Sequence, residues 1–354
     1  MTLDDNNVII PFVLRFSNWR RNTVQKQYTQ GYIKRQRSIA EIFVFNYIPS
    51  ALTSSLLAPF NRVKVILQVQ NFIPGVEKLS VKEAFSKIIK DDGLSSLFRG
   101  NLIYSAKILS GICAKTILFD RFKNRTNYLK DQIKTLKYKI FGINFLLDTI
   151  CAVFASTVSL LMTYPFDLAY GRVAGQLKND KKANLPYKNM KDCFHFSEDA
   201  AKTDFFFMKY YHGISAAIAQ SIVFSSITLI GFQILFRIKK EGLENKKKSN
   251  SFLNLLGGPS IVALIASVAA YPLDTIKREM QVNGAKGFKS QYTDVIYSLQ
   301  AKRQAGFAEA YKGFSMHLVR TIPYAPMQYM IFSSLTKLIT AKNEKKKNHE
   351  NKNK

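Results

Sequence analysis

Three copies of a proline motif recur along this chain at nearly equal spacing. Pro59, Pro165 and Pro272 are 106 and 107 residues apart. The motifs read APFNRVK at 58–64, YPFDLAY at 164–170 and YPLDTIK at 271–277. A proline within an apolar helix removes a backbone hydrogen bond and kinks the helix. A repeat near about one hundred residues indicates three homologous modules in one body.

Long runs without Asp, Glu, Lys or Arg accompany these motifs. Each has roughly 16 to 25 residues, which is long enough to cross or nearly cross a bilayer as a helix. They are Ile42–Phe60, Thr149–Phe166, Gly213–Phe236, Ser249–Leu273 and Thr321–Thr336. A further run, Asn101–Phe119, contains Lys107 and Lys115. We therefore predict an all-α membrane protein with six transmembrane helices, two in each module, rather than a large soluble protein with six buried helices.

The modules and the two chain ends divide the sequence by composition. We place the three repeats at 39–130, 141–240 and 252–340. Residues 1–38 form a basic extension, which is either a targeting segment or a docking arm for a neighbouring protein; two early aspartates argue against a cleaved presequence. Residues 341–354 are rich in Lys and Asn, and we expect this tail to be disordered.

The formal net charge of +28 indicates an anionic partner. Nucleic acid does not fit a multi-pass membrane protein that has no recognisable binding module. No Ser, His or Cys is arranged as a nucleophile with a base, so we predict no enzyme activity and no cofactor. The histidines have no metal-ligand spacing, and the cysteines are scattered, which predicts buried reduced thiols. These residues are His195, His212, His317 and His349, with Cys113, Cys151 and Cys193.

The repeated pattern Pro-x-acid-x-x-base, followed by acid-Gly-x4-aromatic-base-Gly, resembles the signature of the mitochondrial carrier family. The resemblance covers about residues 39–340, and the first module is most similar to the adenine-nucleotide branch. It implies a six-helix bundle of three modules with pseudo-three-fold symmetry. It also implies a central cavity and alternating access across the mitochondrial inner membrane.

The resemblance implies a matrix gate of salt bridges between the motif helices. In the family, the acid of each module pairs with the base of the next, so Asp167 should meet Lys277 and Asp274 should meet Lys64. The third pair is absent, because Asn61 stands at the acid position and Tyr170 at the base position. Losing both charges together is less costly than leaving one charge unpaired, and an amide and a phenol can still form a hydrogen bond.

Two further groups complete the implied gates. Gln68 and Gln281 match the glutamines that brace the salt bridges on the matrix side. On the cytosolic side the family has an aromatic-acid-x-x-base motif, and here it is present only around Asp120 and Lys123. Its counterparts around Gln233 and Ser333 lack charges, so we expect weak closure on that side.

The implied solute contacts lie midway along the second helix of each module. Lys107, Gln220 and Arg320 each follow a turn glycine by seven residues, and Ser221 and Phe224 complete the set. Two cations facing a membrane cavity are expensive unless they bind something, which favours an anionic solute. The alternative is that both cations reach polar surroundings or pair within the protein.

Two functions remain open at this stage. The first is transport of an anionic metabolite, such as a nucleotide or another phosphate compound, across the mitochondrial inner membrane, with inner-membrane lipid such as cardiolipin as a further partner. The second is a degenerate, non-transporting carrier that serves as a structural subunit of an inner-membrane complex and docks through residues 1–38. The missing charges and the long basic ends favour the second, but transport is the leading interpretation, because the two expected cavity cations favour an anionic solute.

Overall fold

The computed structural model of this protein is helical and has no strand among the residues that it describes. Those residues are 43–76, 78–114, 141–178, 185, 187, 190–193, 210–244, 252–291 and 295–352. The chain divides into two compact units. One consists of Met1–Thr53 with Pro326–Lys354, and the other is Ser54–Ala325.

The first unit joins the start of the first predicted span to the last helix. A π-helical turn, η2 (Phe43–Tyr47), leads into α4 (Ile48–Leu56), and α14 (Phe314–Lys352) supplies the other side. Gln328 Nε2 donates to Ser50 Oγ at 2.8 Å. The rings of Phe45 and Phe332 meet edge to face, with centroids 5.9 Å apart. Polar and aromatic contacts therefore join η2 and α4 to α14 within this unit.

The tail differs from its prediction, because the structure continues α14 as a helix to Lys352. Residues 341–352 were expected to be disordered on composition alone. The segment contains no Pro or Gly that would stop a helix, and Lys and Glu are good helix formers. A helix that already exists extends by one residue at little cost, whereas starting one there would be unfavourable.

The first module of the second unit breaks at its proline motif. Leu57 separates α4 from α5 (Ala58–Val69), which begins with Pro59 in its first turn. Pro fits there because its missing N–H would have no helical partner. Short elements follow, and residues 101–114 then form the next helix. The short elements are η3 (Gln70–Phe72), α6 (Val81–Lys87), η4 (Ile88–Asp92) and η5 (Leu94–Phe98).

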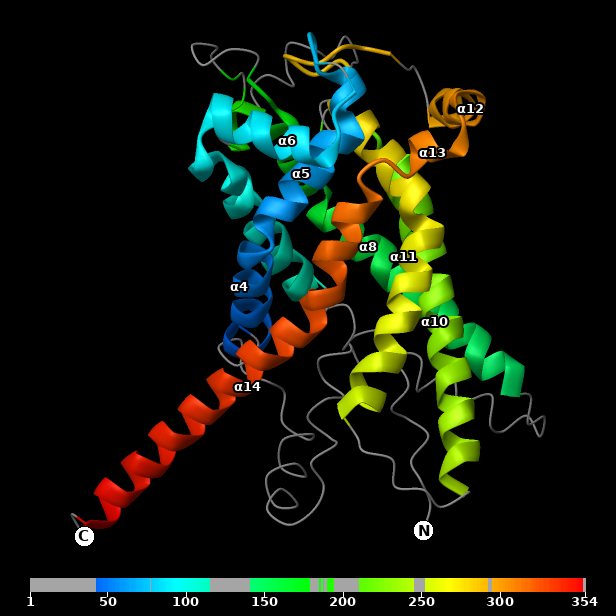
Figure 1. Cartoon of the computed structure of the whole chain (residues 1–354). Helices are drawn as coiled ribbons and strands as arrows, with labels where there is room; N and C mark the ends of the chain where they lie inside the picture. Colours follow the sequence, from blue (N-terminus) through cyan, green and yellow to red (C-terminus); the bar gives the residue numbers. More distant parts are fainter. Residues whose placement is uncertain are drawn as a thin grey trace. The chain divides into compact units, whose positions relative to one another are not determined.

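The second and third modules have longer, unbroken helices. α8 (Phe141–Gly175) contains Pro165 in its interior, and α11 (Phe252–Val282) likewise runs through its motif proline. The helix assignment is therefore interrupted at the motif proline only in the first of the three modules. α10 (Ile214–Glu244) packs against both α8 and α11 (Figure 1). The short helices α12 (Val295–Ala305) and α13 (Phe307–Ala310) precede α14.

A contact repeated in the second and third modules ties each motif helix to the turn that follows it. Tyr164 donates its hydroxyl to the carbonyl of His212 at 2.6 Å, and Tyr271 donates to the carbonyl of Lys312 at 2.8 Å. Both carbonyls immediately precede a turn glycine, either Gly213 or Gly313. These glycines have φ of 79° and 77°, a region that residues with a Cβ rarely adopt. The sequence repeat is therefore also a repeat of backbone geometry.

Two of the predicted spans stand out by length and hydropathy within the described residues. They are Ile214–Phe232, with mean hydropathy 1.7, and Ser260–Val282, with mean hydropathy 1.3. The other predicted spans do not reach the same standard in the described part of the chain. α4 has only 9 residues before the break at Leu57, and the helix at 101–114 is described only in part.

Candidate functional site

Two buried carboxylates lie where α5, α8 and α11 meet. Asp167 on α8 is fully buried, and Asp274 on α11 has 6% of its surface exposed. A buried carboxylate is costly unless cations and hydrogen-bond donors surround it. The side chains that surround these two acids form what we term the charged cluster, which comprises Lys64, Lys107, Asp167, Asp274, Lys277 and Arg278.

Asp167 is shared by three cations. Its Oδ1 lies 2.6 Å from Lys107 Nζ and 3.0 Å from Arg278 Nη2. Its Oδ2 lies 3.5 Å from Lys277 Nζ, and it accepts a hydrogen bond of 3.3 Å from Gln281 Nε2. The expected contact with Lys277 is therefore present but is the longest of the three. Arg278 follows the motif lysine directly and was not among the residues expected at the gate.

Asp274 is contacted by side chains from α5, from α10 and from its own helix. Lys64 Nζ lies 2.6 Å from Oδ2, and Lys277 Nζ lies 3.0 Å from Oδ1. Gln68 Nε2 donates to Oδ2 at 3.2 Å, and Gln220 Nε2 donates to Oδ1 at 3.0 Å. Lys277 thus contacts both acids and connects the two predicted pairs into one network.

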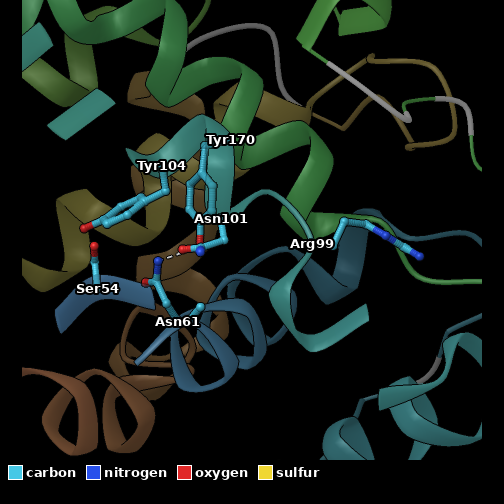
Figure 2. Close-up of a pocket in the computed structure, with 7 residues that line it drawn as sticks. Ser54, Asn61, Arg99, Asn101, Tyr104 and Tyr170 are labelled. Carbon is cyan, nitrogen blue, oxygen red and sulfur yellow. Dashed lines mark hydrogen bonds between the residues drawn. The ribbon is translucent and has the colours of Figure 1, made fainter. Parts of the chain in front are cut away.

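The third position of the predicted gate is a neutral hydrogen bond. Asn61 Nδ2 donates to the hydroxyl oxygen of Tyr170 at 2.5 Å (Figure 2). Both side chains are buried. Arg278 lies over the Tyr170 ring, with its Cζ 5.4 Å from the ring centroid. An amide and a phenol therefore meet where the sequence lacks an acid and a base.

A cavity of about 190 Å³ adjoins the charged cluster. It is lined by basic, polar and aromatic side chains that come from all three modules. The lining residues are Asn61, Lys64, Tyr104, Lys107, Gln220, Phe224, Ser267, Ala270, Tyr271, Asp274, Lys277, Arg278, His317 and Arg320. Four of the five predicted solute contacts are thus among the cavity residues, whereas Ser221 is not.

The two predicted solute cations differ in their partners. Lys107 binds the carboxylate of Asp167, as the alternative interpretation of internal pairing expects. Arg320 instead donates to the hydroxyl of Tyr104, and its Cζ lies 5.3 Å from the centroid of that ring. Lys107 Nζ lies 5.6 Å from the same centroid. The ring of Tyr104, a residue that no sequence motif singled out, therefore lies close to both cations.

Other buried ion pairs escaped the sequence analysis. Arg62 Nη2 lies 3.0 Å from Asp92 Oδ2, and Arg99 shares that oxygen. Lys302 Nζ on α12 lies 2.5 Å from Glu279 on α11. The acid-Gly motif did mark Asp92, but nothing along the chain shows which cation reaches it.

Some predictions concern residues outside the described part of the chain. Asp120 and Lys123 of the predicted cytosolic gate lie there, as does the extension 1–38. No group of three or more His, Cys, Asp or Glu side chains within the described residues is placed to hold a metal ion.

The described residues thus combine long helices, two of them long and apolar enough to cross a membrane, with a buried charge network and a polar cavity. The family profile described as mitochondrial carrier protein matches residues 35–129 and 248–343, which is more than half of the chain. The chain therefore belongs to the mitochondrial carrier protein family, whose members are transporters and not enzymes. The second predicted module, 141–240, lies between the two matched stretches.

Curated relatives cover most of the chain at low identity. Mitochondrial substrate carrier family protein P of Dictyostelium discoideum is 25% identical over 300 residues, which is 83% of this chain and 92% of that protein. A probable chloroplast envelope ADP,ATP carrier of Arabidopsis thaliana is 23% identical over 306 residues, covering 85% and 72%. A mitochondrial coenzyme A transporter of Xenopus laevis is 26% identical over 297 residues, covering 81% and 82%. This chain is thus a divergent member of the family.

Proposed function

We propose that this chain transports an anionic solute, a nucleotide or another phosphate compound, across the mitochondrial inner membrane by alternating access. In this proposal the three modules form a six-helix bundle around the cavity. The observation that carries the proposal is the excess of positive charge at that cavity.

The charges around the cavity do not balance within the described residues. Two carboxylates face five cations, which leaves three positive charges without a matching acid. The acids are Asp167 and Asp274, and the cations are Lys64, Lys107, Lys277, Arg278 and Arg320. Uncompensated charge is costly in a membrane, and an anion with several negative charges would offset it. A diphosphate or triphosphate group fits this balance better than a monocarboxylate does.

The lining and the relatives support the same class of solute. Tyr104, Phe224 and Tyr271 line the cavity and provide aromatic surface that a nucleobase can contact. Relatives of this chain are named as ADP,ATP carriers and as coenzyme A transporters, and both kinds of cargo combine an adenine base with phosphates.

In this proposal the charged cluster is the matrix gate. The ion pairs of Asp167 and Asp274 close it, Gln68 and Gln281 brace it, and the Asn61–Tyr170 hydrogen bond completes it. On the cytosolic side, Asp120 and Lys123 would be the charged residues of the gate. Inner-membrane lipid, including cardiolipin, would surround the bundle, and residues 1–38 would provide either a targeting signal or a docking arm.

The second candidate, a structural subunit of an inner-membrane complex, is favoured by a specific observation. Lys107 and Gln220, two predicted solute contacts, bind the carboxylates of Asp167 and Asp274 in this structure. In that case the charged cluster would stabilise the fold and would not bind a solute.

Uptake by reconstituted vesicles separates the two candidates. Vesicles loaded with ATP should take up labelled ATP or ADP, and not a monocarboxylate. Arg320→Gln should reduce uptake at least about tenfold, because charge-assisted hydrogen bonds are each worth about 1.5 to 3 kcal/mol. Arg303→Gln, which removes the same charge from the exposed surface of α12, is the matched control and should leave uptake unchanged.

Two results would contradict transport. Absence of uptake for ATP, ADP and phosphate, or uptake that survives Lys107→Gln combined with Arg320→Gln, would contradict transport through this cavity. Comigration of the chain with a large complex on a native gel would then support the structural role.

A further inference from the structure

Tyr104 contacts both Arg320 and the neutral Asn61–Tyr170 pair. It lies on the helix formed by residues 101–114 and lines the cavity, and it also packs beside Asn61 and Tyr170 (Figure 2). Its hydroxyl accepts a hydrogen bond from Arg320 Nη2. Its ring packs against the ring of Tyr170, with centroids 5.0 Å apart.

Arg320 differs from the other cations of the cavity in its partner. Lys64, Lys107, Lys277 and Arg278 each lie within 4.0 Å of a carboxylate oxygen, and no such oxygen lies that close to Arg320 within the described residues. Its hydrogen-bond partner is a neutral phenol. At the other four cations an incoming anion would have to displace a carboxylate, whereas at Arg320 it would displace only a neutral phenol and would supply the charge that the phenol lacks.

The ring of Tyr104 packs against Tyr170, which takes part in the Asn61–Tyr170 hydrogen bond. The Tyr170 hydroxyl oxygen accepts a hydrogen bond from Asn61 Nδ2 at 2.5 Å, and the Tyr104 ring packs beside the Tyr170 ring. Tyr170 is 3% exposed, so its position depends on the side chains packed around it. A shift of the Tyr104 ring therefore changes the support of the Asn61–Tyr170 hydrogen bond.

We propose that Tyr104 is a positioning residue that links solute binding at Arg320 to the Asn61–Tyr170 contact. An anion that takes Arg320 removes the hydrogen bond that holds the Tyr104 hydroxyl. The ring is then free to move away from Tyr170, and the neutral contact of the gate loosens before the ion pairs separate. The link between the residues stands by itself, and its use by a solute rests on the proposed function.

The link is measurable without any solute. Arg320→Gln and Asn61→Ala should have non-additive effects on the apparent melting temperature of the purified full chain, differing from their sum by at least about 2 °C. In a Tyr104→Leu background the same two changes should become additive, because the connecting ring is absent. Additive effects with Tyr104 in place would overturn the proposal, whether or not the protein transports anything.

Kinetics in vesicles test how a solute uses the link. Tyr104→Phe keeps the ring and removes the hydroxyl. It should lower KM for ATP about tenfold, since Arg320 no longer gives up a hydrogen bond to bind the anion. It should also lower kcat, because binding no longer releases the ring. Tyr211→Phe removes a hydroxyl that bonds to the carbonyl of Leu161, away from the cavity, and should change neither constant.

The outcomes separate the two proposals. A merely structural role for Tyr104 would lower kcat without lowering KM, and that result would overturn the link to solute binding. If the unaltered protein neither takes up nor binds ATP, ADP or phosphate, the proposed function fails. The melting-temperature comparison then decides alone whether Tyr104 connects Arg320 to Asn61.

Discussion

Replacing Asp167 with asparagine removes the carboxylate that three cations share. The amide has nearly the same shape, so the change removes charge with little change in packing. Lys107, Lys277 and Arg278 would then remain buried near one another without this acid. Asp274→Asn is the matched comparison, because that acid is nearly as buried and, among the described residues, is paired with two cations, Lys64 and Lys277.

The distances predict how the two changes rank. At an effective dielectric constant of about 20, Coulomb's law gives about 6.4 kcal/mol for a contact of 2.6 Å, about 5.5 at 3.0 Å and about 4.7 at 3.5 Å. The gross attraction is thus about 17 kcal/mol for Asp167 and about 12 for Asp274. Desolvation offsets most of it, and breaking a buried pair typically costs about 3 to 5 kcal/mol net. We expect Asp167→Asn to lie in that range and Asp274→Asn to cost about 1 kcal/mol less.

Thermal unfolding of the two purified variants, scanned at one fixed rate, tests this ranking. At about 2 °C for each kcal/mol, Asp167→Asn should lower the apparent melting temperature by about 6 to 10 °C. Asp274→Asn should lower it by about 2 °C less. An Asp167→Asn protein as stable as the unaltered chain would refute the reasoning, and so would a larger loss for Asp274→Asn.

Two more predictions concern the turns and the surface helix. Gly213→Ala should destabilise more than Gly93→Ala in thermal unfolding: both glycines have positive φ, but a Cβ on Gly213 would lie 2.7 Å from the Cβ of Met280, whereas one on Gly93 meets nothing within 4 Å. Hydrogen bonds from Ser80 lower the pKa of Glu83 in the capping box of α6. The stability that these hydrogen bonds contribute should be present above the pKa that Glu83 has in the unfolded chain, and it should be lost as pH falls through the lower pKa of Glu83 in the folded chain. Melting temperature measured against pH tests this, and Glu83→Gln should lack this pH dependence.

Some contacts of the gate residues could be predicted from the sequence, and others could not. The family resemblance, carried onto the motif positions, predicts that Asp274 meets Lys64 and that Asn61 meets Tyr170, and both contacts are present. The spacing does not predict that Arg278 also reaches Asp167. Adjacent residues on a helix point about 100° apart, so Lys277 and Arg278 reach the same acid only through the length of their side chains.

The cavity residues show a second limit. Lys107 has the offset from its turn glycine that marks a solute contact, and this offset does place it at the cavity. Yet its ammonium lies against Asp167, since a flexible lysine binds the carboxylate that is closest in space. Tyr104 lies one turn before Lys107 and matched no motif, although it contacts more of the site than the predicted Ser221 does.

Local rules acting on short stretches determined the helical class, the module repeat and the turns of this protein. Apolar run length, proline position and the left-handed glycines depend on the chain within a few residues of each site, so the sequence alone reveals them. Which cation meets which acid, and which cation keeps only a phenol, was decided by tertiary structure. Most of those contacts join different helices, and the Lys64–Asp274 and Arg278–Asp167 pairs join residues more than one hundred positions apart, so they depend on side-chain reach that spacing along one helix does not encode.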